Sequence, residues 1–292
     1  MTPLRKRMLD ELQLRNLSAN TVERYTSAVQ QFARHFGKSP EKLGPEQVRE
    51  FLLHMMREKK AAANTVLLYR SALRFLYSCT LKVKWFDDSL PHPKRRTVPP
   101  GILSADEITR MLDRTVNLKH WTILATFYAT ALRCGELRHL KVQDIDSGRM
   151  LIHVSHAKGG VPRDVPLSPV LLERLRIYVR RYRPQDWLFP STQKNREPLE
   201  NRSIRYVCRQ AAKRAGIERR IHPHLFRHAC ATHMLDAGAD LRTIQAILGH
   251  ADLRTTARYL HVSTRRMQSF QSPLDSLALK PLDLTGEPEP RS

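Results

Sequence analysis

Residues 150–167 read Met-Leu-Ile-His-Val-Ser-His-Ala-Lys-Gly-Gly-Val-Pro-Arg-Asp-Val-Pro-Leu. Two short strand-like runs, Met150–Ser155 and Val161–Leu167, flank Lys158-Gly159-Gly160, which is typical of a turn. This stretch predicts a small antiparallel β-hairpin. Because the rest of the chain favours helices, we expect a mainly α fold in which the domain around the hairpin is of the α+β type.

Helices are expected on both sides of the hairpin. Ser104 and Glu107 have the spacing of a capping box and predict a helix start. The segment 121–131 is apolar on nearly all sides, which predicts a central buried helix. Residues 201–260 are again helical in pattern, with breaks at glycine and proline. We assign this second domain to residues 102–270.

The first 86 residues predict a separate all-helical domain. Apolar residues recur at helical spacing in three segments, around Val29, Phe51 and Leu73. The segment 87–101 that follows holds four prolines and a basic triplet, so it predicts a semi-rigid linker. Residues 271–292 contain proline and charges of both signs, and we expect a mobile tail unless another subunit orders it.

The sequence is strongly basic. It holds 50 Lys and Arg residues against 28 Asp and Glu, a formal net charge of +22. Basic residues exceed acidic ones both before and after residue 100, so the charge is not confined to one tail. A compact fold with this excess repels itself unless a polyanion neutralises it. The composition therefore favours a nucleic-acid partner.

Other partners and compartments are less well supported. An acidic membrane is the rival polyanion, but the longest apolar-rich stretch, 121–132, is too short to span a bilayer. The N-terminal residues lack the apolar run and cleavage site of a secretory signal. The four cysteines are scattered without the spacing of zinc sites or a disulfide framework. We expect a cytoplasmic protein without metal or membrane attachment.

Several residues outside the predicted cores could carry chemistry, although each has an ordinary structural explanation. Arg133 and Glu136 could form a structural ion pair, and Lys158 could be a solvated residue at a hairpin tip. His224 could cap a helix or lie in a core, and Tyr259 could pack beside Leu260. Further members of the set are Arg227, three residues after His224, and His250, which follows an expected helix end at Gly249.

Together these residues form a set suited to attack on a phosphodiester without a metal ion. Arginines bind non-bridging phosphate oxygens and stabilise the charge of the transition state. A tyrosine hydroxyl needs a base or positive surroundings to become a nucleophile. The departing deoxyribose oxygen needs an acid, which a lysine or histidine can supply. No Asp/Glu cluster accompanies the set.

These motifs resemble those of the tyrosine recombinase, or phage integrase, family, and the likeness to its Xer-type members runs from about Leu14 to Val262. Four blocks carry it, in the order and spacing of the family: 131–140, 156–160 with 165–167, 224–233, and 248–250 followed by Tyr259. The resemblance implies an all-helical, SAM-like core-binding domain and a DNA breaking-rejoining catalytic domain, which clamp DNA from opposite faces.

The resemblance also implies a covalent mechanism. Tyr259 would be the nucleophile, forming a 3′-phosphotyrosyl link and releasing a 5′-hydroxyl. Lys158 would protonate the leaving oxygen, and His224 would assist proton transfer at the tyrosine. Because the covalent link conserves the energy of the phosphodiester, neither ATP nor another cofactor is implied.

The remaining site residues are implied to bind the phosphate. Arg133 and Arg227 would hold the scissile phosphate, and His250 would donate a hydrogen bond to one of its oxygens. Glu136 would support this set from behind, without touching the phosphate. One departure from the family pattern is Ala131, which stands where glycine is common, and we expect the packing to tolerate it.

The resemblance further implies double-stranded DNA with inverted half-sites as the partner. A dimer would bind one site, a tetramer would pair two duplexes, and strands would be exchanged in pairs through a Holliday junction. Chromosome-dimer resolution, plasmid or transposon resolution, and integration or excision of a mobile element are all open, with a mild preference for a mobile element or plasmid. A second recombinase or an accessory protein is a further possible partner.

Two other functions share parts of this pattern. A type IB topoisomerase uses the same phosphotyrosine chemistry, but it relaxes DNA as a monomer without exchanging strands between sites. A DNA-binding regulator would keep the clamp and lose cleavage. The sequence favours neither, because the N-terminal domain is Xer-like and all six candidate catalytic positions hold competent residues.

Overall fold

In the computed structural model, the apolar stripes before residue 87 are the inner faces of packed helices. The elements are α1 (Pro3–Leu14), α2 (Ala19–Phe36), η1 (Pro40–Lys42), α3 (Pro45–Arg57), α4 (Ala63–Phe75) and a π-helical turn, η2 (Leu76–Thr80). Helix α2 packs against α4, and Phe32, Leu73 and Leu76 are fully buried. The sequence analysis did not single out α1, although Thr2 caps it and Pro3 occupies its first position.

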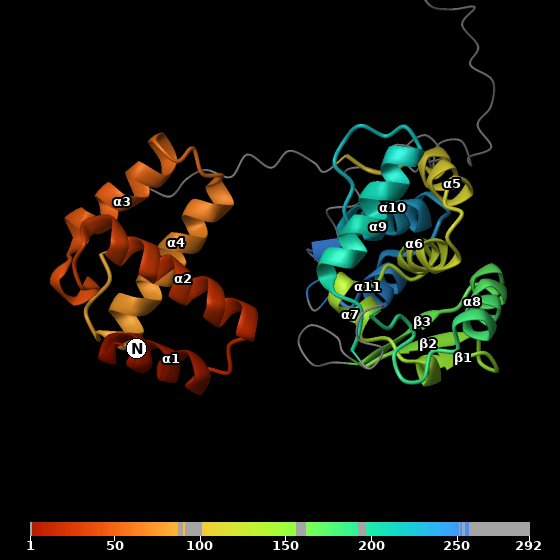
Figure 1. Cartoon of the computed structure of the whole chain (residues 1–292), viewed down its shortest axis with the longest axis horizontal. Coiled ribbons are helices and arrows are strands. Elements are labelled where there is room, and N and C mark those ends of the chain that lie inside the picture. The colour runs from red at the N-terminus through yellow and green to blue at the C-terminus, as the bar shows by residue number, and fades with distance from the viewer. Residues whose placement is uncertain are drawn as a thin grey trace, which may run out of the picture. The chain divides into compact units, whose positions relative to one another are not determined.

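The structure describes residues 2–86, 90, 101–155, 162–191, 197–250, 252 and 255–256. The chain divides into two units, Met1–Pro99 and Pro100–Ser292, each with its own core (Figure 1). Most of the expected linker and the whole of the expected tail lie outside the described residues. Among the described residues, no helix is long and apolar enough to cross a membrane.

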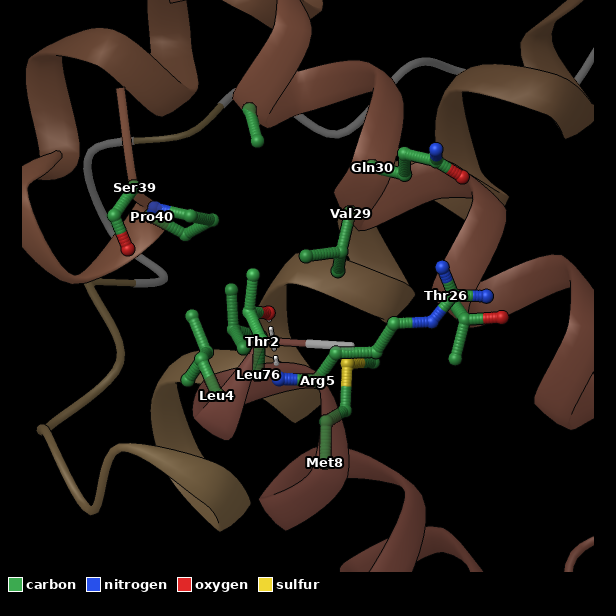
Figure 2. Close-up of a pocket in the computed structure, with 11 residues that line it drawn as sticks. Thr2, Leu4, Arg5, Met8, Thr26, Val29, Gln30, Ser39, Pro40 and Leu76 are labelled. Atoms are coloured by element: carbon green, nitrogen blue, oxygen red, sulfur yellow. Dashed lines mark hydrogen bonds between the residues drawn. The ribbon is translucent and has the colours of Figure 1, made fainter. Parts of the chain in front are cut away.

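The first unit contains a cavity of about 500 Å³ between α1 and α2 (Figure 2). Leu4 and Met8 of α1 and Val29 of α2 line it, together with Pro40 and Leu76. These five side chains are buried and belong to or adjoin the core of the unit, so the cavity is a mainly apolar gap in the helix packing.

The second unit is built around one helix. Its helices are α5 (Ala105–Asp113), α6 (Leu118–Thr130), α7 (Cys134–Arg138), α8 (Pro169–Tyr182), α9 (Asn201–Arg214), α10 (Pro223–Asp236) and α11 (Leu241–Leu248). Helix α6 contacts α5, α8, α9 and α10, which confirms the predicted central helix (Figure 1). Its threonines Thr122, Thr126 and Thr130 are fully buried. The helix tolerates their hydroxyls because each donates to the carbonyl four residues earlier, at 2.6–2.7 Å.

The predicted hairpin is present, and a third strand extends it. Strands β2 (Leu151–Val154) and β3 (Arg163–Pro166) pair antiparallel, with Ile152 opposite Val165. A two-residue strand, β1 (Ile145–Asp146), follows the short turn η4 (Val142–Asp144) and pairs with β2, giving the order β1-β2-β3. The sequence analysis expected two strands only, because β1 is too short to show an alternating pattern.

Candidate active site

Arg133 lies in a tight turn between α6 and α7. Helix α6 ends at Thr130, one residue before the predicted end of the buried helix, and Arg133 is the N-cap of the separate helix α7. Ala131, which is fully buried, adopts a left-handed conformation with φ of +52°. That conformation costs a residue with a Cβ atom about 1 kcal/mol, which explains why glycine suits this position.

Glu136 holds Arg133 through both its backbone and its side chain. The Arg133 backbone N–H donates to Glu136 Oε2 at 2.8 Å, and Arg133 Nη1 donates to Oε1 at 2.8 Å. Arg133 Nη2 also donates to the carbonyl of Gly249 at 3.3 Å. The Arg133 side chain is only 20% exposed, so these contacts leave it a small range of orientations.

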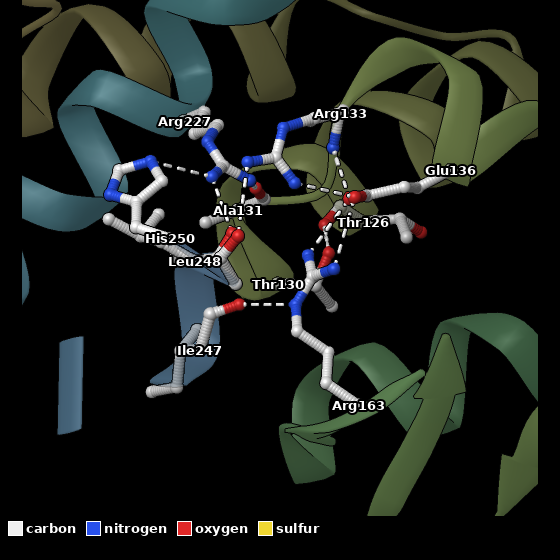
Figure 3. A network of polar contacts seen from close by, with 11 residues as sticks. Thr126, Thr130, Ala131, Arg133, Glu136, Arg163, Arg227, Ile247, Leu248 and His250 are labelled. Carbon is white, nitrogen blue, oxygen red and sulfur yellow. Dashed lines mark hydrogen bonds and ion pairs between the residues drawn. The ribbon is translucent and has the colours of Figure 1, made fainter. Parts of the chain in front are cut away.

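Arg163 is a member of this network that the sequence analysis missed. It lies at the start of β3 and donates from Nη1 and Nη2 to the two oxygens of Glu136, at 3.0 and 2.8 Å (Figure 3). Its Nε donates to the carbonyl of Ile247 at 2.8 Å. A signal was available, because Arg163 shares the inward face of the strand with buried Val165. An inward-facing arginine needs a buried acceptor.

Arg227 is buried in α10, where two backbone carbonyls and the ring of His250 contact its guanidinium. Its Nη1 donates to the carbonyl of Ala131 at 2.8 Å, and its Nη2 donates to the carbonyl of Leu248 at 2.5 Å (Figure 3). Nη2 also contacts His250 Nε2 at 3.0 Å. These three contacts orient the guanidinium, a group that binds phosphate oxygens through two parallel N–H donors.

His250 follows the left-handed cap residue Gly249 at the end of α11. Because a guanidinium only donates, His250 Nε2 accepts from Arg227, and the neutral ring carries its proton on Nδ1. Nδ1 then donates to the hydroxyl of Thr256 at 2.9 Å, and Thr256 is fully buried. Gln245 further holds the segment by donating to the His250 carbonyl at 3.0 Å.

The other predicted site residues are placed less completely. His224 is exposed in the first turn of α10, three residues before Arg227, so the two share a helix face. Lys158 and Tyr259 lie outside the described residues. Strands β2 and β3 on either side of Lys158 are described, and so is Thr256, three residues before Tyr259. The structure therefore brings together Arg133, Glu136, Arg227 and His250.

The charges at the centre of the network are unequal. Burial raises the pKa of Glu136, but hydrogen bonds from Arg163 and Arg133 outweigh it and lower the pKa to about 2. One carboxylate thus lies between two guanidiniums, and buried Arg227 adds a third positive charge nearby. The described part of the site is positive overall. Within that part of the chain, no group of three or more His, Cys, Asp or Glu residues is arranged to hold a metal ion.

Residues 102–266 match the model of the phage integrase family, and residues 4–87 match that of the N-terminal SAM-like domain of phage integrases. The chain belongs to the phage integrase family. Two named relatives of the family span nearly its whole length. "Putative integrase/recombinase y4qK" of Sinorhizobium fredii is 44% identical over 278 residues, 95% of this chain and 90% of the relative. "Tyrosine recombinase XerD" of Shewanella oneidensis is 32% identical over 92% of this chain and 95% of the relative.

Solved structures share the phage integrase fold. The crystal structure of XerH site-specific recombinase bound to palindromic difH substrate, a post-cleavage complex, has a TM-score of 0.71 to this chain. The two are 22% identical, over 87% of this chain and 80% of XerH. The family match and the XerD relative identify this member of the phage integrase family as a Xer-like tyrosine recombinase.

Proposed function

We propose that this tyrosine recombinase cleaves and rejoins double-stranded DNA at a specific site, through a covalent 3′-phosphotyrosyl intermediate on Tyr259. The observation that carries the proposal is the joint anchoring of two guanidiniums and one imidazole. Arg133 donates to the carbonyl of Gly249, and Arg227 donates to that of Leu248 and contacts His250. Guanidinium donors held in this way stabilise the charge that develops on a phosphate in the transition state.

The proposed reaction is a pair of transesterifications. The Tyr259 hydroxyl loses its proton to His224 and attacks the scissile phosphorus, while the bond from phosphorus to the 5′ oxygen breaks. Lys158 gives a proton to that oxygen, which leaves as a 5′-hydroxyl. Religation reverses these steps with a 5′-hydroxyl from another strand. One phosphodiester is formed for each one broken, so the reaction as proposed draws on no ATP and no metal ion.

The proposed assembly is the one that the resemblance to the tyrosine recombinases implies. Residues 1–86 would form the core-binding domain, 87–101 the linker, 102–270 the catalytic domain and 271–292 a C-terminal tail. A dimer would bind two inverted half-sites, and a tetramer would exchange strands in pairs through a Holliday junction. A second recombinase or accessory protein would join where the half-sites differ. The four cysteines lack the spacing of a disulfide framework, which supports a cytoplasmic setting.

The test is the capture of denaturant-resistant protein–DNA adducts from cells that express the chain, followed by sequencing of the attached DNA. Tyr259→Phe removes the nucleophilic oxygen, and we expect it to abolish adducts while leaving DNA binding intact. Tyr182→Phe, a change at an exposed tyrosine of α8, is the matched control and should leave adducts unchanged.

The distribution of adducts separates the candidate functions. Adducts at one discrete, repeated sequence support site-specific recombination and identify the site. Adducts scattered over the genome would favour the type IB topoisomerase. An equal yield from Tyr259→Phe contradicts the nucleophile assignment, and no wild-type adduct favours the DNA-binding regulator.

A further inference from the structure

Arg163 occupies a position where three segments of the catalytic unit meet. It starts on β3, its Nη1 and Nη2 reach Glu136 in α7, and its Nε reaches the carbonyl of Ile247 in α11 (Figure 3). The Arg163 side chain is 9% exposed and that of Glu136 is 2% exposed. Both charges are thus withdrawn from water. In such surroundings removing one partner leaves the other charge buried and unpaired, which is strongly unfavourable.

The end of α11 is fitted closely to this side chain. Gly249 has φ of +59°, and a Cβ atom built on it would lie 3.0 Å from Arg163 Cδ. The same turn supplies the Gly249 carbonyl to Arg133 and leads directly to His250. The position of Arg163 is therefore linked to two of the groups proposed to bind the phosphate.

The charge balance explains why an arginine is needed. Glu136 accepts from Arg133 and holds it in place, but a carboxylate paired with a single guanidinium cancels the charge of that guanidinium. An arginine whose charge is cancelled stabilises a phosphate poorly. With Arg163 bound to both carboxylate oxygens, the group of three carries one net positive charge.

We propose that Arg163 is a positioning residue that binds Glu136 and so keeps the positive charge of Arg133 available to the scissile phosphate. This inference rests on the proposed function, because it assigns a role within the same site. Arg163 acts through Glu136 and Arg133 and does not itself touch the DNA.

The test compares Arg163→Met, Glu136→Gln and the double variant with the wild-type chain. The amide introduced by Glu136→Gln retains an oxygen acceptor for Arg133 but has no charge. The substrate is a duplex that carries the sequence recovered by adduct capture and releases a short 5′ fragment on cleavage, so that adducts accumulate. Arg149→Met is the matched control, because it removes an exposed arginine of the turn between β1 and β2, whose partner is Asp146. Thermal unfolding establishes that every variant is folded at the assay temperature.

We expect Arg163→Met to slow adduct formation at saturating DNA by about 100-fold, with little change in Kd, because a transition-state interaction is weakened. The double variant should form adducts at least about tenfold faster than Arg163→Met, since Glu136→Gln removes the charge that cancels Arg133. A second duplex has a methylphosphonate at the scissile position, which carries one negative charge less. On it the Arg163→Met penalty should shrink to under about tenfold, whereas a purely structural defect would slow both duplexes equally.

Two results overturn the inference alone. In the first, the wild-type chain forms adducts and Arg163→Met forms them equally fast. In the second, the double variant is as slow as Arg163→Met, and the Arg163→Met penalty is the same on both duplexes. If neither the wild-type chain nor Arg149→Met forms adducts, the proposed function fails and the inference fails with it. The wild-type reaction therefore tells the two failures apart.

Discussion

A buried threonine holds the imidazole of His250 from the side opposite Arg227. The Thr256 hydroxyl lies 2.9 Å from His250 Nδ1, and Arg227 Nη2 lies 3.0 Å from Nε2. The donating guanidinium of Arg227 selects the Nδ1–H tautomer, and the Thr256 hydroxyl, which can donate or accept, then accepts from Nδ1. Because Thr256 precedes Tyr259 by three residues, the segment that carries the proposed nucleophile also orients the imidazole of His250.

Thr256→Val tests this contact, because valine has nearly the shape of threonine and no hydroxyl. We expect the Nδ1–H of His250 to lose its acceptor, and adduct formation to slow by about tenfold, the equivalent of one hydrogen bond to a partly buried group. Nitrogen-15 NMR of His250 at neutral pH should still show the Nδ1–H tautomer, because Arg227 continues to donate to Nε2, but the Nδ1–H proton should exchange faster with water in the variant. Thr255→Val, a change at the exposed neighbouring threonine, is the control. An exchange rate that Thr256→Val leaves unchanged would contradict the assignment.

Helix α11 connects these residues, and its ends are set by two caps. Asp240 accepts from the backbone N–H groups of Arg242 and Thr243, both at 2.9 Å, and left-handed Gly249 ends the helix. The last carbonyls, those of Ile247 and Leu248, accept from Arg163 and Arg227. A helix of eight residues is too short to be stable alone, so its caps and these arginines hold it in place.

Asp240→Ala removes the N-terminal cap, and we expect the Tm of the catalytic unit to fall by roughly 2–4 °C, as for the loss of one helix cap. Hydrogen exchange should quicken at the amides of α11 more than at those of α6. Asp240→Asn keeps a capping oxygen and should retain most of the stability. Equal losses from the two variants would mean that the charge of Asp240, and not its cap, stabilises the helix.

At the scale of the whole molecule, the two units differ in how they depend on pH. One ion pair of the first unit, Arg7–Glu41, lies at the surface with both side chains about half exposed. Such pairs contribute little to stability. The second unit buries the Glu136 carboxylate. Burial raises the pKa of this group, but hydrogen bonds from Arg163 and Arg133 outweigh burial and lower the pKa from 4.5 to about 2.

A carboxylate with a lowered pKa in the fold stabilises the fold above its unfolded pKa. Its contribution, roughly 3 kcal/mol, is complete above about pH 4.5 and is lost as the pH falls toward 2. We expect acid to lower the Tm of the transition that belongs to residues 100–292. The Tm difference between wild type and Glu136→Gln should disappear across this range. Glu173→Gln, at an exposed position of α8, is the control and should follow the wild type at each pH. A difference that persists at pH 2 would rule out ionised Glu136 as its source.

The sequence by itself determined most of the elements and the identity of the proposed site residues. Periodic apolar residues, the Ser104 capping box and the turn at Gly249 act over a few positions, so local pattern suffices to predict them. The excess of basic residues indicated a nucleic-acid partner, because net charge depends on composition and not on the fold. The elements that were missed, α1 and β1, have a weak amphipathic pattern and only two residues, respectively.

The tertiary structure alone decided how the site is supported. Arg163 is 27 residues from Glu136 along the chain, and Arg227 is 96 residues from the carbonyl of Ala131. Nothing in the local sequence of either arginine specifies its acceptor, because the acceptor is brought near only when α6, α10, α11 and β3 pack around one core. The break after Thr130 and the left-handed Ala131 likewise depend on that packing, which holds a strained residue in place so that Arg133 faces Glu136.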